Sequence, residues 1–463
     1  MKKFKLTALA LATVMFLGAC NTANEDEGGK KSGQDSEKTT KEAEDVGFEY
    51  PELPKGDGSE VIVWNRIFED WNQEHFEQQA EKYNSLDRGY TVKQEFVPED
   101  AWADKLLTSQ ATGETPDTYI AAYNHIYGHV DNDEILPLDD IFAKEQLDDI
   151  LPNVREMVTF NDKVWAYPQL VEPSTVLFYR TDKFKEVGIK EVPKTWADFI
   201  AAAEKLKKLT DENTFVLGIP GFGVEMSWST WGWQMGAAGH LAINDEWSEP
   251  TLDQGYLDLA NFWGELYSKG LVPEQPLGAY NDIAAYGDEA LFMQFTGSWA
   301  IAQLINDYPE IYEKTGVAVP PTKDGSSDSV VATNGGWTYV IDAKTKNKDG
   351  AYNYISWLLA EDPATPAEFF DVAKYSKAAP RKSVSEYINS KGVAPDHADI
   401  INTIASRAVS EANYSWNISM EVAGLFEDVA LRGEDAAKAA EKRSESIKKI
   451  IEDEKIQGKN PRA

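Results

Sequence analysis

From Glu60 onward, short apolar runs alternate with longer stretches in which apolar residues recur every three or four positions. This pattern predicts strands followed by helices. A helix is expected after the first strand because Phe76, Ala80 and Tyr83 share one helical face. Repeated units of this kind predict an α/β fold in which helices cover the sheets. The runs that predict strands are residues 61–64, 90–96, 116–121, 164–167 and 175–179.

Two further helices carry clear signals. Thr195 is a typical N-cap residue for a helix with an apolar stripe, formed by Trp196, Phe199, Ile200, Ala203 and Leu206. Residues 435–454 predict a long helix whose apolar side chains face the body, namely Ala436, Ala440, Ile447 and Ile451. Residues 102–111 and 344–359 suit two more helices, and no internal repeat is evident.

The first residues of the chain have the pattern of a secretory signal. Residues 1–5 are rich in lysine, residues 6–18 are apolar, and Ala19 precedes Cys20, the only cysteine of the chain. The apolar run is shorter than the about 20 residues that a membrane span needs. Residues 17–20 resemble a bacterial lipoprotein box, which implies cleavage before Cys20, a diacylglycerol on its sulfur and a fatty acyl chain such as palmitate on the new amino terminus. Two or more acyl chains anchor a protein stably, so we expect it on the extracellular face of the cell membrane.

Residues 1–19 are therefore expected to be a signal peptide, and residues 20–58 the lipidated cysteine with a disordered tether. The tether contains almost nothing that can be buried, since Glu, Asp, Lys, Ser, Thr and Gly dominate it. As a flexible coil it spans roughly 35 Å. The lysine-rich signal and the long acidic tether favour a Gram-positive cell surface.

The net charge and the cysteine content exclude some classes of binding partner and some kinds of site. The net charge is −33; removal of residues 1–19 takes away three lysines and no acid, which leaves 42 basic and 78 acidic residues and a charge of −36. Such a surface repels nucleic acid and anionic lipid headgroups. The acidity is equally compatible with a role in solubility alone. The single cysteine, used for the anchor, leaves no disulfide and no cysteine-based metal site.

Several blocks of sequence resemble extracellular solute-binding proteins of sugar ABC importers, the maltose-binding-protein-like family. Each block alone is degenerate, but their order and spacing from residue 60 to about residue 451 follow the family. In chain order they are residues 113–117, 163–168, 176–184, 187–189, 193–199, 287–300 and 334–337.

The resemblance implies a two-lobe periplasmic-binding-protein-like (type II) fold with a hinge and a cleft between the lobes. We expect the first lobe at residues 59–168 plus 338–378 and the second at residues 169–337 plus 379–463. The implied function is capture of a carbohydrate, an oligosaccharide, by hinge closure and its delivery to ABC permease subunits in the membrane. We expect a monomer that is not an enzyme and uses no cofactor or metal.

A sugar ring has a weakly apolar C–H face and an edge of hydroxyls, so its site needs flat rings and hydrogen-bonding side chains. Aromatic residues make up 11% of the chain, including 14 Trp and 20 Tyr, more than a core requires. Trp299 is the first candidate, because in related proteins the aromatic of this element faces the ligand. Trp337 follows two glycines that allow close backbone approach, and both ligand contact and packing between the lobes remain open for it.

Further aromatic candidates lie elsewhere in the expected second lobe. Three tryptophans crowd residues 226–236, where the family has an aromatic subsite. Trp231 is preferred as a ligand contact, Trp228 comes next, and Trp233 is expected in the core. Trp416 resembles a late aromatic that stacks on a second sugar ring. Four other tryptophans have core spacing and are expected to be structural: Trp165, Trp196, Trp263 and Trp357.

Polar candidates complete the expected site. Trp64, Asn65 and Arg66 end the first strand and are placed to contribute from the first lobe, with Asn65 or Arg66 bonding sugar hydroxyls. A surface ion pair is the alternative for Arg66. Asp117 and Glu172 are carboxylate candidates, because charged hydrogen bonds are stronger than neutral ones.

Motifs of enzymes were sought in the sequence. His125 and His129 lack the glutamate of the zinc-protease helix, residues 221–226 fail at the third glycine of a dinucleotide loop, and no Gly-x-Ser-x-Gly element occurs. Two alternatives stay open on the residues alone. A secreted glycoside hydrolase also combines tryptophans with carboxylates. The same fold can also bind a cationic solute such as a polyamine through cation–π contacts.

Overall fold

Two central sheets organise the part of the chain that the computed structural model describes, residues 53, 55–67 and 70–462. The expected signal peptide, the lipidated Cys20 and nearly all of the tether lie outside the described residues. Among the residues described, no helix has both the length and the apolar character needed to cross a membrane.

The first sheet has the strand order β2-β1-β3-β13-β6. Strand β1 runs parallel to β2 and β3, whereas β13 runs antiparallel to β3 and β6. The chain therefore leaves β1 and β3 at the same edge of the sheet. The strands are β1 (Glu60–Ile67), β2 (Thr91–Pro98), β3 (Thr118–Ala122), β6 (Tyr167–Pro168) and β13 (Trp337–Ile341).

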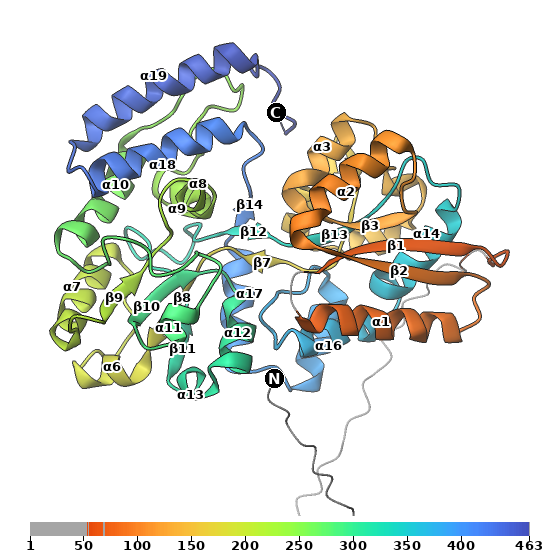
Figure 1. The fold of residues 1–463 in the computed structure, drawn as a ribbon, viewed down its shortest axis with the longest axis horizontal. Helices are drawn as coiled ribbons and strands as arrows, with labels where there is room; N and C mark the ends of the chain where they lie inside the picture. The colour runs from red at the N-terminus through yellow and green to blue at the C-terminus, as the bar shows by residue number, and fades with distance from the viewer. Residues whose placement is uncertain (1–52, 54, 68–69, 463) are drawn as a thin grey trace, which may run out of the picture. The chain divides into compact units, whose positions relative to one another are not determined.

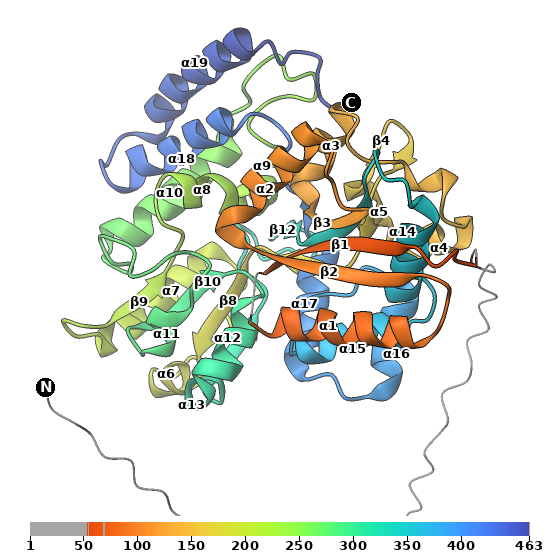
Figure 2. The same cartoon turned by 45° about the vertical axis from the view of Figure 1, so that its right-hand side comes forward.

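Helices cover both faces of this sheet, as the apolar pattern predicted. Figures 1 and 2 show α1 (Asp70–Ser85) and α2 (Glu99–Thr112) on opposite sides of β1 and β2. Phe76 and Tyr83 of α1 are buried, and the Tyr83 hydroxyl donates to Asn353 Oδ1 at 2.8 Å. The other elements around this sheet are η1 (Tyr123–His125), α3 (Ile126–Asp131), η2 (Leu138–Asp140), α4 (Lys144–Asp148), α5 (Pro152–Met157), β4 (Thr159–Phe160), β5 (Lys163–Val164), α14 (Lys348–Ile355), the π-helical η4 (Ser356–Ala360), α15 (Ala364–Val372) and α16 (Lys382–Lys391).

The second sheet has the strand order β11-β8-β10-β9. Strand β10 is antiparallel to β8 and parallel to β9. Its strands are β8 (Val176–Arg180), β9 (Phe215–Gly218), β10 (Leu291–Thr296) and β11 (Thr315–Ala318). The helices that follow these strands or pack near them are α6 (Thr181–Glu186), α7 (Trp196–Leu206), η3 (Lys207–Leu209), α8 (Val224–Ser229), α9 (Trp231–Ala238), α10 (Gln254–Ser268), α11 (Ala284–Gly287), α12 (Ala300–Asp307), α13 (Pro309–Tyr312), α17 (Asp396–Ser406), α18 (Trp416–Ala430) and α19 (Ala436–Glu454).

Capping and periodicity placed several helices correctly. Helix α7 begins after Thr195, whose hydroxyl accepts from the backbone N–H of Asp198 at 3.0 Å. Helix α19 begins after Asp435, and Ile447 and Ile451 are buried as predicted. The single strand predicted at residues 164–167 is wrong, because β5 ends at Val164 and β6 begins only at Tyr167.

A third, small sheet joins the other two. We call it the crossing sheet; its strand order is β14-β12-β7, with β7 (Glu172–Pro173), β12 (Thr333–Gly335) and β14 (Val409–Ser410). Strand β7 lies between β6 of the first sheet and β8 of the second, and β12 leads back into β13. The chain thus passes between the two sheets through short paired strands.

The expected lobe boundary near residue 378 needs a correction. Helix α16 packs against α15, and its Val384 joins Phe76 of α1 in one apolar cluster. The backbone N–H of Ser383 also donates to Asp149 Oδ1 at 3.0 Å. Residues 379–391 therefore contact the helices of the first sheet, and we place this boundary later, between α16 and α17.

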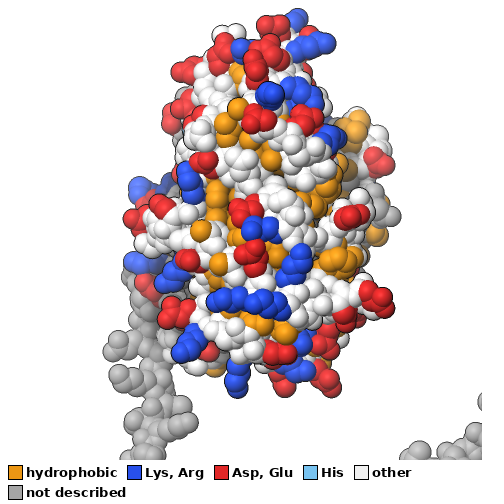
Figure 3. Space-filling view, turned by 90° about the vertical axis from the view of Figure 1, so that its left-hand side faces the viewer, with side chains coloured by type: hydrophobic (Ala, Val, Ile, Leu, Met, Phe, Trp, Pro, Cys, Tyr) orange, Lys and Arg blue, Asp and Glu red, His pale blue; other side chains and the backbone are white. Residues whose placement is uncertain are grey.

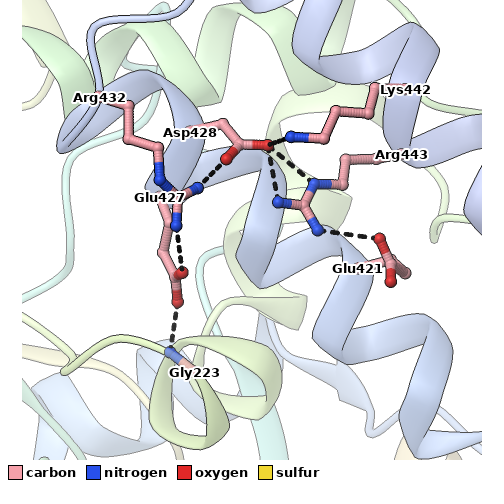
Figure 4. A network of polar contacts seen from close by, with 7 residues as sticks. All are labelled: Gly223, Glu421, Glu427, Asp428, Arg432, Lys442 and Arg443. Carbon is pink, nitrogen blue, oxygen red and sulfur yellow. Dashed lines mark hydrogen bonds and ion pairs between the residues drawn. The ribbon is translucent and has the colours of Figure 1, made fainter.

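A buried carboxylate fixes α18 to α19. Asp428 on α18 is fully buried and accepts from Arg443 Nη2 at 2.7 Å, from Lys442 Nζ at 3.1 Å and from Arg432 (Figure 4). The guanidinium of Arg443 occupies the space above Gly424, where a Cβ would lie 2.4 Å from its Cζ. Charge-assisted bonds and a missing side chain therefore set how these two helices pack.

We predict that Asp428→Asn lowers the free energy of unfolding by about 2–3 kcal/mol, because the cations lose their buried counter-charge. Urea denaturation measures this loss. Glu445→Gln on the exposed side of α19 is the matched control; its contact with Lys448 is a surface ion pair worth about 0–1 kcal/mol. Equal effects of the two substitutions would contradict a stabilising role for the Asp428 network.

Candidate functional site

Three aromatic rings gather where β10 ends. Trp228 packs edge-on against Tyr280, with ring centroids 5.3 Å apart. Trp299 lies 6.4 Å from Trp228 and 6.3 Å from Tyr280. Trp228 and Trp299 are half-buried, so part of each indole is open to solvent, whereas Tyr280 is buried. We call these residues the aromatic cluster.

The orientation of Trp299 depends on a bare backbone position. Its ring folds back over Gly297, where a Cβ would lie only 2.0 Å from Cζ3 of the indole. The indole Nε1–H donates to the backbone oxygen of Asn281 at 3.2 Å. Any side chain at position 297 therefore displaces the ring, and the Gly297 turn presents Trp299 in one defined orientation.

Tyr280 joins the aromatic cluster to the crossing sheet. Its hydroxyl donates to the backbone oxygen of Ser174 at 2.7 Å, and burial raises the pKa of this phenol, which stays neutral. Its backbone N–H donates to Glu225 Oε1 at 2.9 Å. Glu225 belongs to α8, the helix that carries Trp228. The sequence analysis missed Tyr280; its place in a loop rich in proline and glycine, residues 273–280, is the signal that marks it.

A second aromatic pair lies at the start of α18. Trp416 is 43% exposed, and its ring meets Trp231 edge-to-face at 6.2 Å. Trp231 is buried, and its Nε1–H donates to Ser419 Oγ at 3.2 Å. The preference for Trp231 over Trp228 is thus wrong: Trp231 supports Trp416 from inside, and Trp228 is the accessible ring. Trp233 lies in the core, as expected.

At the carboxyl edge of the first sheet, Arg66 and Trp337 come together. The guanidinium carbon of Arg66 lies 4.7 Å from the centroid of the Trp337 ring, within cation–π range. Both residues are half-buried. Gly336 has φ +121°, and a Cβ there would lie 2.7 Å from the backbone oxygen of Leu170, so only glycine allows this approach.

Trp64 and Asn65 do not reach a surface where a ligand can bind. Trp64 is buried beneath Lys105, whose Nζ lies 4.3 Å from the centroid of its ring. Asn65 is fully buried; it donates to Gln94 Oε1 at 2.6 Å and accepts from the Tyr339 hydroxyl. Helices cover both faces of the sheet, so only Arg66, at the end of the strand, comes near its edge.

The prediction for Asp117 is also wrong. This residue precedes β3, at the amino end of the strand, whereas Arg66 and Trp337 lie at the opposite edge. Its carboxylate accepts from the backbone N–H of Ile62 at 2.8 Å and from the Thr345 hydroxyl. Asp117 therefore fixes the start of the sheet.

Glu172 lies in the crossing sheet and forms an ion pair with Lys377, whose side chain is fully buried. Glu411 follows β14 on the other side of β12, and burial together with the charge of Glu172 raises the pKa of its carboxyl to about 7. The structure thus places Glu172 between the two sheets, among charged neighbours that spacing alone did not indicate.

Titratable groups elsewhere in the described residues form no metal centre. Within the described range, no three His, Cys, Asp or Glu side chains are arranged to hold an ion. His129 Nδ1 lies 2.7 Å from Glu134 Oε2. Burial and the charges of His129 and Arg66 lower the pKa of His125.

Acidic and basic side chains are interspersed on the face of the molecule drawn in Figure 3, with hydrophobic side chains exposed between them. The excess of acid is therefore not gathered into a uniform acidic patch on this face, and a mixed surface of this kind favours solubility.

Comparison with known proteins gives a consistent result. A family model described as bacterial extracellular solute-binding protein matches residues 70–365. A protein of Brucella abortus named as a binding protein is 23% identical over 291 residues, 62% of this chain and 69% of its own. The multiple sugar-binding protein of Streptococcus mutans is 26% identical over 263 residues, 55% of this chain and 58% of its own.

Solved structures match the whole fold. The sugar-binding protein MalE from Xanthomonas citri has a TM-score of 0.72 at 18% identity and covers 86% of this chain and 98% of its own. The cyclic alpha-maltosyl-1,6-maltose binding protein from Arthrobacter globiformis has a TM-score of 0.71 at 17% identity and covers 85% and 99%. These likenesses confirm the predicted fold class, a type II periplasmic-binding-protein-like α/β fold.

We predict that Gly297→Ala changes the near-ultraviolet circular dichroism and shifts the tryptophan emission to the red, because the added methyl forces the Trp299 indole away from Trp228 and Tyr280. Gly278→Ala is the control, since no atom lies within 4 Å of a Cβ at that position. Identical spectra for both variants and the unaltered protein would show that Gly297 does not determine the orientation of the Trp299 indole.

Proposed function

The chain belongs to the bacterial extracellular solute-binding proteins, a family of binding proteins and not of enzymes, and we propose that it captures an oligosaccharide and delivers it to the permease of an ABC importer. The aromatic cluster carries this proposal. Its two half-exposed indoles are held by Gly297, Asn281 and Tyr280, so no ligand is needed to order them. Rings ordered before binding lose little entropy when a sugar stacks on them.

The two sheets offer complementary chemistry for a sugar. Trp228 and Trp299 supply flat apolar surfaces for C–H faces, and Trp416 supplies a further exposed ring. Arg66, beside Trp337, supplies charged donors for hydroxyl oxygens. Closure of a hinge that brings both sets onto one ligand stabilises the closed state by the difference in affinity between the two states.

A cationic ligand fits this arrangement less well. The guanidinium of Arg66 already lies within cation–π range of Trp337, so that face of the ring is not open to the ammonium group of a polyamine. A glycoside hydrolase needs a pair of carboxyl groups about 5–9 Å apart across the scissile bond, and two of the proposed site carboxylates serve other contacts: Asp117 fixes the start of β3 and Glu172 pairs with Lys377.

The names of similar proteins support a carbohydrate or polyol ligand. They include a multiple sugar-binding protein from Streptococcus mutans and a mannitol-binding protein from Pseudomonas aeruginosa. At 22–26% identity, these names support the class of ligand and leave its length and linkage to experiment.

We also propose that Cys20 carries the lipid that holds the protein on the outer face of the cell membrane of a Gram-positive bacterium, as a tethered monomer. The lysine-rich start, the apolar run and the small residues before Cys20 support this. A tether rich in charged residues then leaves the binding protein free to meet its permease.

A ligand screen by thermal shift tests the sugar proposal, with maltose, maltotriose, isomaltotriose, raffinose, mannitol and spermidine as probes. We expect at least one oligosaccharide to raise the melting temperature, because a ligand that binds only the folded state stabilises it. Stabilisation by spermidine alone, or release of shorter sugars from an oligosaccharide, would refute the proposal.

We predict that Trp299→Ala lowers the affinity for that oligosaccharide at least tenfold, measured by calorimetry, while the melting temperature without ligand stays nearly unchanged. A half-exposed platform contributes to binding more than to folding. Leu107→Ala, at an exposed site on α2, is the control and should leave the affinity unaltered. A large loss of ligand-free stability with unaltered affinity would place Trp299 in the core instead.

We predict that Cys20→Ser releases the protein from the membrane fraction of the producing cell and abolishes labelling with radioactive palmitate, because the serine oxygen is not a substrate for diacylglycerol transfer. Fractionation and labelling measure both effects. Retention of the variant on the membrane would show that another segment anchors it.

A further inference from the structure

Glu172 and Glu411 lie on either side of a bare position in the crossing sheet, Gly335. Gly335 of β12 pairs with Glu172 of β7, and Asn334 pairs with Ser410 of β14. Glu411 follows Ser410, so it comes to the other side of Gly335. A Cβ at Gly335 would lie 3.3 Å from Glu411 Oε1. The missing side chain therefore leaves room for the carboxyl of Glu411 beside Gly335, the residue that pairs with Glu172.

Cations are engaged around this pair. Lys377, fully buried, forms an ion pair with Glu172 Oε1. Arg462 donates to the Ser410 hydroxyl, next to Glu411, while its guanidinium carbon lies 5.4 Å from the centroid of the Phe160 ring. Arg407 donates to the backbone oxygens of the loop at residues 326–329. Lys377 is thus the cation that contacts the pair directly, while Arg462 and Arg407, on the neighbouring elements, bind other polar groups.

The protonation state of Glu411 changes the energy of this arrangement. Burial first, and the charge of Glu172 second, raise the pKa of Glu411 from 4.5 to about 7. A protonated carboxyl removes the repulsion and supplies a donor, whereas an ionised one places two like charges side by side with little solvent.

We propose that protonation of Glu411 beside Glu172 stiffens the crossing sheet, and that ionisation of Glu411 loosens it, so that lobe movement and ligand capture respond to the pH outside the cell. Glu172 lies in β7, through which the chain passes between the two sheets, and Glu411 follows β14, which pairs with the second such strand, β12. Any rotation at these crossings shears β7 against β12 and β14 and changes the separation of the carboxyl groups. The link to ligand capture rests on the proposed function; the proton dependence of the crossing sheet does not.

The sign of the effect follows from linkage. A carboxyl whose pKa is higher in the folded than in the unfolded protein holds its proton more tightly when folded. Stability therefore falls as the pH rises from about 4.5 to about 7 and is constant above. In the Glu411→Gln variant the side chain is neutral at every pH, so the variant does not lose this part of the folding stability in this pH range.

The proposal is tested by measuring the melting temperature of the full-length protein without ligand at two pH values. We expect Glu411→Gln to melt at the same temperature as the unaltered protein at pH 4.5, and of the order of 2 °C higher at pH 8. Glu310→Gln, on exposed α13, is the matched control and should show no such pH-dependent gain.

Hydrogen exchange of the backbone amides of β12, corrected for the intrinsic effect of pH, reports the crossing sheet itself. We expect protection to fall between about pH 4.5 and about pH 7 in the unaltered protein, and to stay constant in Glu411→Gln. Equal pH dependence in both proteins would overturn the proposal.

A second variant distinguishes a specific loss of the Glu172–Glu411 interaction from general misfolding of the first variant. Glu172→Gln removes the neighbouring negative charge, so the midpoint of the exchange transition should move to lower pH. An unmoved midpoint would show that the pair does not interact. Because no sugar is present, failure here is separate from failure to bind an oligosaccharide.

Discussion

The site depends on hydrogen bonds to the backbone of β7 and of the residue that follows this short strand. The oxygen of Pro173 accepts from the backbone N–H of Ser298 at 3.0 Å, which fixes the turn before Trp299. The oxygen of Ser174, the next residue, accepts from the Tyr280 hydroxyl at 2.7 Å. The aromatic cluster is therefore attached to the same segment that joins the two sheets. Movement at this crossing is transmitted directly to the rings proposed to hold a ligand.

Bare backbone positions make this arrangement possible. Gly297 leaves room for an indole, Gly336 for the oxygen of Leu170, and Gly335 for the carboxyl of Glu411. Each glycine lies beside a residue proposed to act in binding or at the hinge, and at each one a side chain would meet an atom that already occupies the space. Absent side chains shape this site as much as aromatic ones do, which suits a protein that grips a ligand without transforming it.

Local sequence predicted the elements well and the orientations less well. The N-cap at Thr195 and the apolar periodicity of α7 and α19 are short-range signals, and they proved right. Trp64, Asn65 and Asp117 were misjudged because their exposure depends on helices that cover the sheet and on which edge a strand end meets. Tyr280 and Glu411 were missed for the same reason: their partners lie more than 50 residues away in sequence.

The Asp428 network also limits how three helices can move relative to one another. Arg443 fills the space above Gly424, while Glu427 on the same helix accepts from the backbone N–H of Gly223 at 2.6 Å, at the start of α8 (Figure 4). Helices α8, α18 and α19 are thereby clamped into one stiff block that carries both Trp228 and Trp416. The distance between Trp228 and Trp416 is therefore set by this block of helices and does not depend on the angle of any hinge. An oligosaccharide that spans both rings, as proposed, must therefore match this spacing, and the block restricts the length of the ligand.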